Sequence, residues 1–359
     1  MHASVLSLVV ATLAPVTVVT PGAPGEEAAA DQGWQGLDQE IAQLASSLDG
    51  GALVQLSGWT ELEVRHSGDA MFAPAPNTDL SGFDVRSARI QANATLGQYD
   101  VELSYELESG DAELLDAFAS VPLFGQSSLT VGQFRPPTVW SALIYEKNTI
   151  LAGRTQLGDI LDERDTGFMF VSGAGPIDIY FALQNGSDGT SDDYRYTLRG
   201  TYDFFGDAFG PSEGAWGYGP GTHLSAGVAY QDDAGILNGG LLTGEAALVH
   251  GPLSLHFEVA EYDEMYDASV VHPVTGTALA NTSPFSLTFG FLAGATPWEL
   301  VVRFEGIDDP LDTTRTTYGV NYYTERGHDA KWQLGVQSFE SDAVNSDATL
   351  IQFGVTVGV

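Results

Sequence analysis

From residue 52 to the end of the chain, apolar and polar residues alternate one by one within segments of about ten residues. Successive side chains of a β-strand point to opposite faces, so each segment predicts a strand with one apolar and one polar face. In residues 101–108, for example, Val101 and Leu103 alternate with Glu102 and Ser104. Sixteen such segments begin near residues 52, 83, 99, 112, 127, 164, 176, 192, 221, 240, 252, 284, 297, 315, 330 and 346.

The connections between these segments alternate in length. Tight links lie near residues 97, 125, 175, 251, 295 and 328, whereas longer or more polar links occupy 67–82, 135–163, 186–191, 232–239, 262–283, 306–314 and 340–345. Transmembrane barrels have an even number of strands, with short turns at one end and long loops at the other. The pattern therefore predicts an all-β chain whose residues 51–359 form a sixteen-stranded antiparallel transmembrane β-barrel. A water-soluble β-sandwich is the alternative, and the Gly/Pro-rich link at 206–219 breaks the rhythm.

Composition excludes several classes of protein. The formal net charge is −35, which argues against nucleic acid as a partner because phosphate binding needs a basic surface. No apolar run after residue 25 reaches the roughly 20 residues that a membrane-spanning helix needs. The chain contains no cysteine, so it can hold neither a disulfide nor a thiolate metal site. The acidity is explained either by solvation of the surface or by an electric field that acts on ions in a pore.

The N-terminus reads as a targeting segment followed by a short helix. Residues 1–25 lack Lys, Arg, Asp and Glu, and the apolar stretch 5–19 precedes the small-residue run 28–30. We therefore expect residues 1–30 to be a signal peptide, although the usual positive N-terminal region is missing. Residues 31–50 predict an amphipathic helix with heptad spacing, which would form a short coiled coil or pack on the barrel mouth.

The alternation also divides the side chains between lipid and lumen. A barrel of this width has a polar, wet interior, so polar positions face the pore. We expect the pore lining to include Arg89, Glu102, Glu106, Arg195, Arg199, Glu258 and Arg303. Their neighbours that would face lipid are Leu62, Ile90, Leu103, Leu198, Phe257, Val302 and Leu334. Arg86 and Arg89 differ in parity, which predicts a shift in register within residues 84–89.

Aromatic residues near the segment ends match the interfacial girdles of membrane barrels. From this collective placement we expect the girdles to contain the following residues: Trp59, Tyr99, Tyr105, Trp140, Tyr145, Tyr194, Tyr202, Tyr230, Tyr262, Tyr266, Trp298, Tyr322, Tyr323 and Trp332.

The connection 135–163 is long and too apolar for a purely extracellular loop, since it contains Leu143-Ile144-Tyr145 and Ile150-Leu151. We expect it to fold into the lumen and to narrow the pore. Four of the thirteen cations, which would attract anions at such a constriction, lie in or beside it: Arg135, Lys147, Arg154 and Arg164. The alternative is that these cations simply pair with Glu146, Asp159, Asp162 and Glu163.

The stretch 132–173 resembles the phosphate-selective porin O and P family of outer-membrane porins. The resemblance rests on the Gly-Gln-Phe-Arg-Pro-Pro run at 132–137, on Lys147-Asn148 and Arg154, and on Arg164-Asp165 with Gly167. It implies a sixteen-stranded homotrimeric porin whose third loop folds into the lumen. Members of the family carry ladders of Arg and clusters of Lys along the pore, whereas this chain has two lysines in total, so phosphate selectivity is not expected. Val359 also replaces the usual terminal aromatic residue.

Motifs for catalysis and for metal or cofactor binding are absent from the sequence. It contains no Gly-x-Ser-x-Gly elbow, His-Glu-x-x-His pair or phosphate-binding Gly-Lys loop, and its seven His are scattered. Residues 185–193 carry oxygen ligands without the EF-hand spacing. We therefore expect a non-enzymatic outer-membrane porin that contacts membrane lipid and passes small hydrophilic solutes or ions, with no nucleic acid, cofactor or metal. A barrel hydrolase and a surface-structural or adhesin barrel are the alternatives.

Overall fold

The computed structural model describes residues 53–69, 80–108, 112–186, 194–218, 221–233, 239–264, 266, 271–272, 275–294, 296–325, 327–342 and 348–358. The predicted signal peptide (1–30) and helix (31–50) lie outside these residues, as does most of the oxygen-rich segment 185–193. Residues 52–359 form one compact unit, the barrel.

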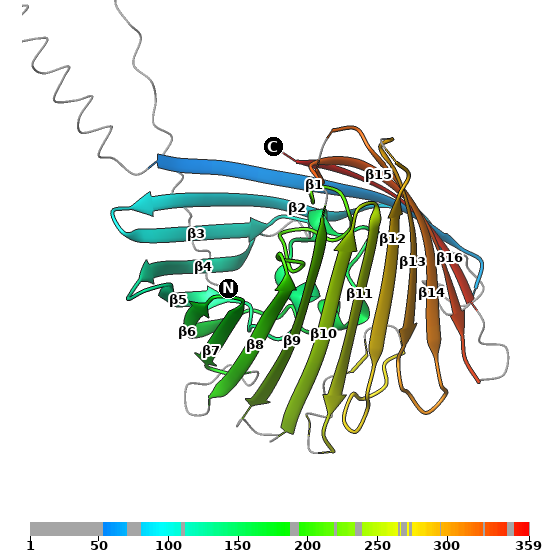
Figure 1. Ribbon diagram of the computed structural model, residues 1–359. Helices are drawn as coiled ribbons and strands as arrows, with labels where there is room; N and C mark the ends of the chain where they lie inside the picture. The colour runs from blue at the N-terminus through cyan, green and yellow to red at the C-terminus, as the bar shows by residue number, and fades with distance from the viewer. Residues whose placement is uncertain are drawn as a thin grey trace, which may run out of the picture. The chain divides into compact units, whose positions relative to one another are not determined.

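Sixteen strands close into a single antiparallel barrel, in which each strand pairs with its neighbours in sequence and β16 pairs with β1 (Figure 1). The predicted fold is therefore confirmed. The largest differences in strand start are at β2, predicted near 83 and found at 80, and at β8, predicted near 192 and found at 195. The strands are β1 (Leu53–Ser67), β2 (Leu80–Leu96), β3 (Tyr99–Glu106), β4 (Glu113–Pro122), β5 (Ser127–Phe134), β6 (Asp165–Ala174), β7 (Ile177–Gln184), β8 (Arg195–Phe205), β9 (Thr222–Asp233), β10 (Gly239–His250), β11 (Leu253–Tyr262), β12 (Phe285–Leu292), β13 (Trp298–Gly306), β14 (Thr314–Tyr323), β15 (Ala330–Glu340) and β16 (Ala348–Gly358).

The predicted alternation of connection lengths is also present. Two residues link β2 to β3, β6 to β7 and β10 to β11, all at the end of the barrel that is periplasmic in membrane barrels. The exception at this short-turn end is the link 206–221 between β8 and β9. The predicted register shift is confirmed, because Glu61 pairs with Ser87 while Leu62 pairs with Val85, which leaves Arg86 as the extra residue of a β-bulge.

The outer surface is apolar, as a barrel surrounded by lipid requires. All seven side chains predicted to face lipid are exposed, from Phe257 and Val302 to Leu62 and Ile90. Several girdle aromatics are exposed on the same surface, namely Tyr99, Tyr105, Tyr194, Tyr202, Tyr230, Trp298 and Trp332. Among the described residues, no helix is both long and apolar enough to cross a bilayer.

Five of the predicted girdle aromatics instead lie inside, which corrects that assignment. Trp59, Trp140, Tyr262 and Tyr323 are buried, and Tyr145 packs against Trp59 with ring centroids 5.2 Å apart. Trp59 has the parity of Glu61 and therefore points into the lumen. The prediction went wrong because it used position along the strand and ignored the face from which the ring projects.

Residues 135–164 fold into the barrel, as predicted, and carry three short helices: α2 (Trp140–Leu143), η1 (Glu146–Asn148) and α3 (Gln156–Ile160) (Figure 1). The apolar side chains of this inward loop form a core inside the barrel. Val139, Ala142, Leu157 and Leu161 pack with strand residues of β10 and β11 and with Leu279 of the link 263–284. A smaller cluster joins Ile150, Leu151 and Val301. Burial of this apolar surface stabilises the inward position of the loop.

Candidate pore constriction and lumen

The inward loop is attached to the lumen wall by hydrogen bonds from its backbone and its short helices. Ser141 donates to Glu258 over 2.6 Å, and the Trp140 amide donates to Glu245 over 2.6 Å. The amide of Gln156, at the start of α3, donates to Glu305 over 2.7 Å. Carboxylates at helix starts accept the amides that have no partner within the helix, so these glutamates stabilise α2 and α3.

Cationic wall residues bind the loop through its carbonyl groups. Arg303 Nη1 donates to the Arg154 carbonyl over 2.7 Å, and Lys331 Nζ donates to the Lys147 carbonyl over 2.6 Å. Asn321 donates to the Ile150 carbonyl over 2.7 Å. The polar side chains of β10–β15 that carry these bonds are almost fully buried. Along this part of the wall the charged side chains of the lumen bind the loop and are shielded from solvent.

A cluster of charges lies where the inward loop crosses to β2. The Glu146 carboxylate is 2.8 Å from Arg154, 3.3 Å from Arg89 and 3.6 Å from Arg135. Burial by itself would raise the pKa of Glu146, but the charges of these three arginines outweigh burial and hold the pKa well below its usual range. Glu146 therefore stays ionised and compensates part of the charge of these buried cations, which also reach Glu106 and Asp162.

The structure brings three of the four predicted constriction cations together. Arg135 and Arg154 share Glu146, while Arg164 is 3.1 Å from Asp116 and 3.7 Å from Asp162. Lys147 lies apart, 2.7 Å from Asp329 in the β14–β15 turn, with its Nζ 5.3 Å from the Trp59 ring centroid. Each of the four thus has a carboxylate partner.

The predicted pore-lining residues all project into the barrel, but most of them are covered. Arg199 pairs with Glu245, and Arg195 lies 3.3 Å from Asp165. Glu258 and Arg303 are buried under the inward loop, and Arg89 is buried against Trp59, 4.9 Å from its ring centroid. Glu102 and Glu106 are half-buried, and Glu102 accepts a hydrogen bond from Tyr145 over 2.9 Å.

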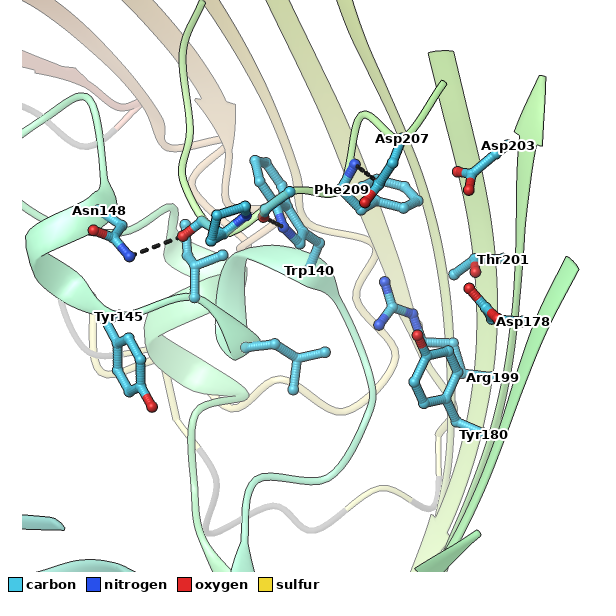
Figure 2. Close-up of a pocket in the computed structure, with 14 residues that line it drawn as sticks. Trp140, Tyr145, Asn148, Asp178, Tyr180, Arg199, Thr201, Asp203, Asp207 and Phe209 are labelled. Carbon is cyan, nitrogen blue, oxygen red and sulfur yellow. Dashed lines mark hydrogen bonds between the residues drawn. The ribbon is translucent and has the colours of Figure 1, made fainter. Parts of the chain in front are cut away.

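Open space remains between the inward loop and the wall formed by β7 and β8 (Figure 2). This cavity measures about 410 Å³. Asp178, Asp203 and Asp207 line it, and the Arg199 guanidinium is the one cationic group among the lining residues. Burial raises the pKa of Asp207, and the charge of Asp203 adds to the effect. Sequence reasoning missed these aspartates, although the parity of Asp178 against Ile177 and Ile179 would have assigned it to the lumen.

A second cavity, of about 350 Å³, lies against β1–β4. Its ionisable lining residues are Asp100 and Glu102, beside the amides of Gln55 and Asn93. Both cavities are near the short-turn end of the barrel, because Asp100 and Asp178 each lie at the second position of a strand that follows a tight turn. The open part of the lumen is therefore acidic at this end.

Ser141, His256 and Glu258 converge inside the barrel, a combination that a hydrolase would need. Ser141 donates to Glu258, whose carboxylate is 3.8 Å from His256, and all three side chains are buried. A nucleophilic serine requires a base that accepts its proton and a path for the substrate. This serine donates to the carboxylate, and neither ring nitrogen of His256 has a hydrogen-bond partner, so the three groups are not arranged as a serine–histidine pair. No cluster of metal-ligating residues occurs within the described part of the chain.

The closed sheet, its apolar exterior and its inward loop define a porin-like transmembrane β-barrel, the architecture of an outer-membrane protein. No family model matches the chain. No curated protein matches it in sequence.

Solved structures do match the fold. A loop-deletion mutant of OmpT, an outer membrane protein of Vibrio cholerae, aligns with a TM-score of 0.58 at 14% identity, over 86% of this chain and 99% of that one. The anion-selective porin from Comamonas acidovorans gives 0.57 at 12% identity, and a mutant of the Rh. blastica porin gives 0.54 at 14%. Both of these cover 86% of this chain and 100% of the other. Identities this low establish the shared fold alone.

Proposed function

We propose that this barrel is a passive porin through which small hydrophilic solutes or ions diffuse, with a preference for cations. The observation that carries the proposal is the distribution of charge in the lumen. Carboxylates border the open cavities, whereas the arginines of the constriction are paired and largely buried. Acidic walls around a narrow aqueous path concentrate cations through their field.

Phosphate is a poor fit to this lumen, although the stretch 132–173 resembles the phosphate-selective porin O and P family. Lys331 is fully buried and bonded to loop carbonyls, and Lys147 is paired with Asp329. Neither lysine offers a free ammonium group to an anion in the pore. We propose that the chain shares the strand–loop–strand framework of that family without its selectivity.

The test is the reversal potential of the purified protein in planar bilayers under a KCl gradient. We expect a cation preference that decreases when Asp178→Asn and Asp203→Asn are combined. Glu340→Gln combined with Asp342→Asn is the matched control, because it removes two negative charges from exposed positions at and just after the end of β15. Strong anion selectivity of the unmodified protein contradicts the proposal.

The bilayer recording and a cleavage assay together separate the alternatives. A surface-structural or adhesin barrel predicts no conductance, and a hydrolase predicts ester or peptide cleavage that depends on Ser141. We further propose that the protein is a homotrimer, which crosslinking in native membranes tests.

A further inference from the structure

The link between β8 and β9, which interrupts the series of tight turns, also folds into the lumen over its described residues 206–218. It meets the inward loop through a set of hydrogen bonds, two of which are drawn in Figure 2. Asn148 donates to the Pro211 carbonyl over 2.8 Å, and Trp140 Nε1 donates to the Gly210 carbonyl over 2.8 Å. The Glu213 amide in turn donates to the Asn148 carbonyl over 2.9 Å. The two segments thus form one unit inside the barrel.

The link is also fixed to the wall behind it. The buried Glu213 carboxylate lies 3.4 Å from Arg303 of β13, and it accepts the Ile150 amide over 2.9 Å. Trp216 stacks on Tyr323 of β14 with centroids 5.3 Å apart and planes within 1°. Gly214 has a φ of +84°, and a Cβ there would lie 2.6 Å from Ile150. A segment held by a buried ion pair, a ring stack and a required glycine has a defined position.

The space behind the link is closed. Ala208, Glu213, Gly214 and Tyr218 cover wall residues of β10–β12, among them Ser254 and His256, and leave a cavity of only about 20 Å³. The space in front of the link is the acidic cavity of about 410 Å³, which Asp207, Phe209 and Pro211 border. The link therefore separates a filled part of the lumen from an open part.

We propose that residues 206–218 are a second constriction element, which seals the β9–β14 side of the lumen from the periplasmic end and confines solutes to the path past Asp178, Asp203 and Asp207. This inference rests on the proposed porin function. The inward loop narrows the pore from one side, and this periplasmic wedge (residues 206–218) sets the width and charge of the exit.

One test removes the wedge. Deletion of residues 207–220 joins Gly206 to Gly221 and leaves four residues between the paired Phe205 and Leu224, a length that ordinary hairpins use. We expect single-channel conductance to rise, by roughly two-fold if conductance follows the open cross-section of the pore. A deletion variant that assembles and keeps the conductance of the unmodified protein overturns the inference.

A second test needs no deletion and exploits the absence of cysteine from the chain. A cationic methanethiosulfonate reagent is added from the periplasmic side to single-cysteine variants in planar bilayers. We expect it to reduce the current of Asp203→Cys and to leave Ser254→Cys unchanged until the wedge is deleted. Leu253→Cys is the control, because this neighbouring side chain faces outward.

Equal modification of Ser254→Cys and Asp203→Cys in the full-length protein overturns the inference while the porin function stands. No current from the unmodified protein overturns the porin function, and the inference with it. The two failures are therefore distinguishable.

Discussion

At the scale of single residues, Glu146 is the central anion of the constriction, because its carboxylate contacts three arginines. Glu146→Gln removes the carboxylate that the three buried arginines share and leaves them only Glu106 and Asp162. Breaking a buried pair costs up to about 3–5 kcal/mol. We expect the loop to loosen, open-channel noise to rise, and the reversal potential to shift towards anions. Single-channel recording and amide hydrogen exchange over residues 144–156 measure these effects.

Glu163→Gln is the matched control for that experiment. It removes the same charge from the same connection, but Glu163 is 62% exposed and only reaches Arg195 at 3.5 Å. An exposed pair contributes about 0–1 kcal/mol, so noise and exchange should stay close to those of the unmodified protein. Equal effects of the two variants would mean that net charge, and not the arginine cluster, governs the constriction.

His272, in the link 263–284, makes the attachment of α3 sensitive to pH. Its Nε2 lies 3.0 Å from Gln156 Oε1, and its Nδ1 accepts the Thr275 amide over 3.3 Å, an arrangement that requires a neutral ring. Burial, together with the charge of Arg315, lowers the pKa of His272 to about 4. Between pH 6.5 and 4 the unfolded link therefore binds a proton that the folded link does not, so its stability falls as the pH drops through this window.

Hydrogen exchange over residues 275–284, corrected for intrinsic rates, measures this loss. We expect protection at pH 7 and progressive loss towards pH 4. His272→Gln should flatten the dependence, whereas His66→Gln, at an exposed position on β1, should leave it unchanged. A pH dependence that survives in His272→Gln would assign the effect to another group.

At the scale of elements, Gly132 and Gly167, two of the glycines in the stretch 132–173, are required by the packing of the strands and not by the solute. Gly132 of β5 pairs directly with Gly167 of β6. A Cβ on Gly132 would lie 2.2 Å from the Ala117 carbonyl oxygen, and a Cβ on Gly167 would lie 2.1 Å from that of Leu183. Glycine in a strand marks such close approaches of backbone. These two positions of the resemblance therefore reflect strand packing next to the constriction.

Gly132→Ala should destabilise the barrel, since Gly132 also has a φ of +135°. Strain of this kind costs about 1–3 kcal/mol, before the clash with β4 is added. Urea unfolding from lipid vesicles measures the loss. Gly200→Ala in β8 is the control, because a Cβ there meets nothing within 4 Å, and its effect should stay within about 0.5 kcal/mol. Equal stability of the two variants would contradict the steric argument.

The strands could be predicted from the sequence because lipid and lumen impose opposite polarity on alternate side chains. The same alternation could not reveal what covers the lumen face. Glu258 and Arg303 have the parity of pore residues, yet the inward loop buries them. The wedge was visible only as an irregular connection, since its position depends on Glu213 meeting Arg303 and Trp216 meeting Tyr323, contacts between distant segments that no local pattern encodes.

At the scale of the whole molecule, every functional statement depends on the outer surface meeting lipid. On β8 the outward side chains run from Tyr196 through Leu198 to Tyr202, so an aliphatic residue lies between two aromatic ones. Tyr202 pairs with Ile177, the first residue of β7 next to a tight turn, and is therefore close to the membrane interface. Leu198 is nearer the middle of the apolar band.

The lipid environment makes the cost of a charge depend on its depth. Leu198→Arg should lower the free energy of unfolding from lipid vesicles by about 2–4 kcal/mol, whereas Tyr202→Arg should lower it by only about 0–1 kcal/mol. A water-soluble sandwich would expose both positions to solvent and tolerate both changes alike, because surface substitutions there cost within about 0.5 kcal/mol. Urea titration of the two variants in the same vesicles decides between these outcomes. Equal, small losses in the free energy of unfolding would mean that this surface does not contact lipid, which the proposed pore requires.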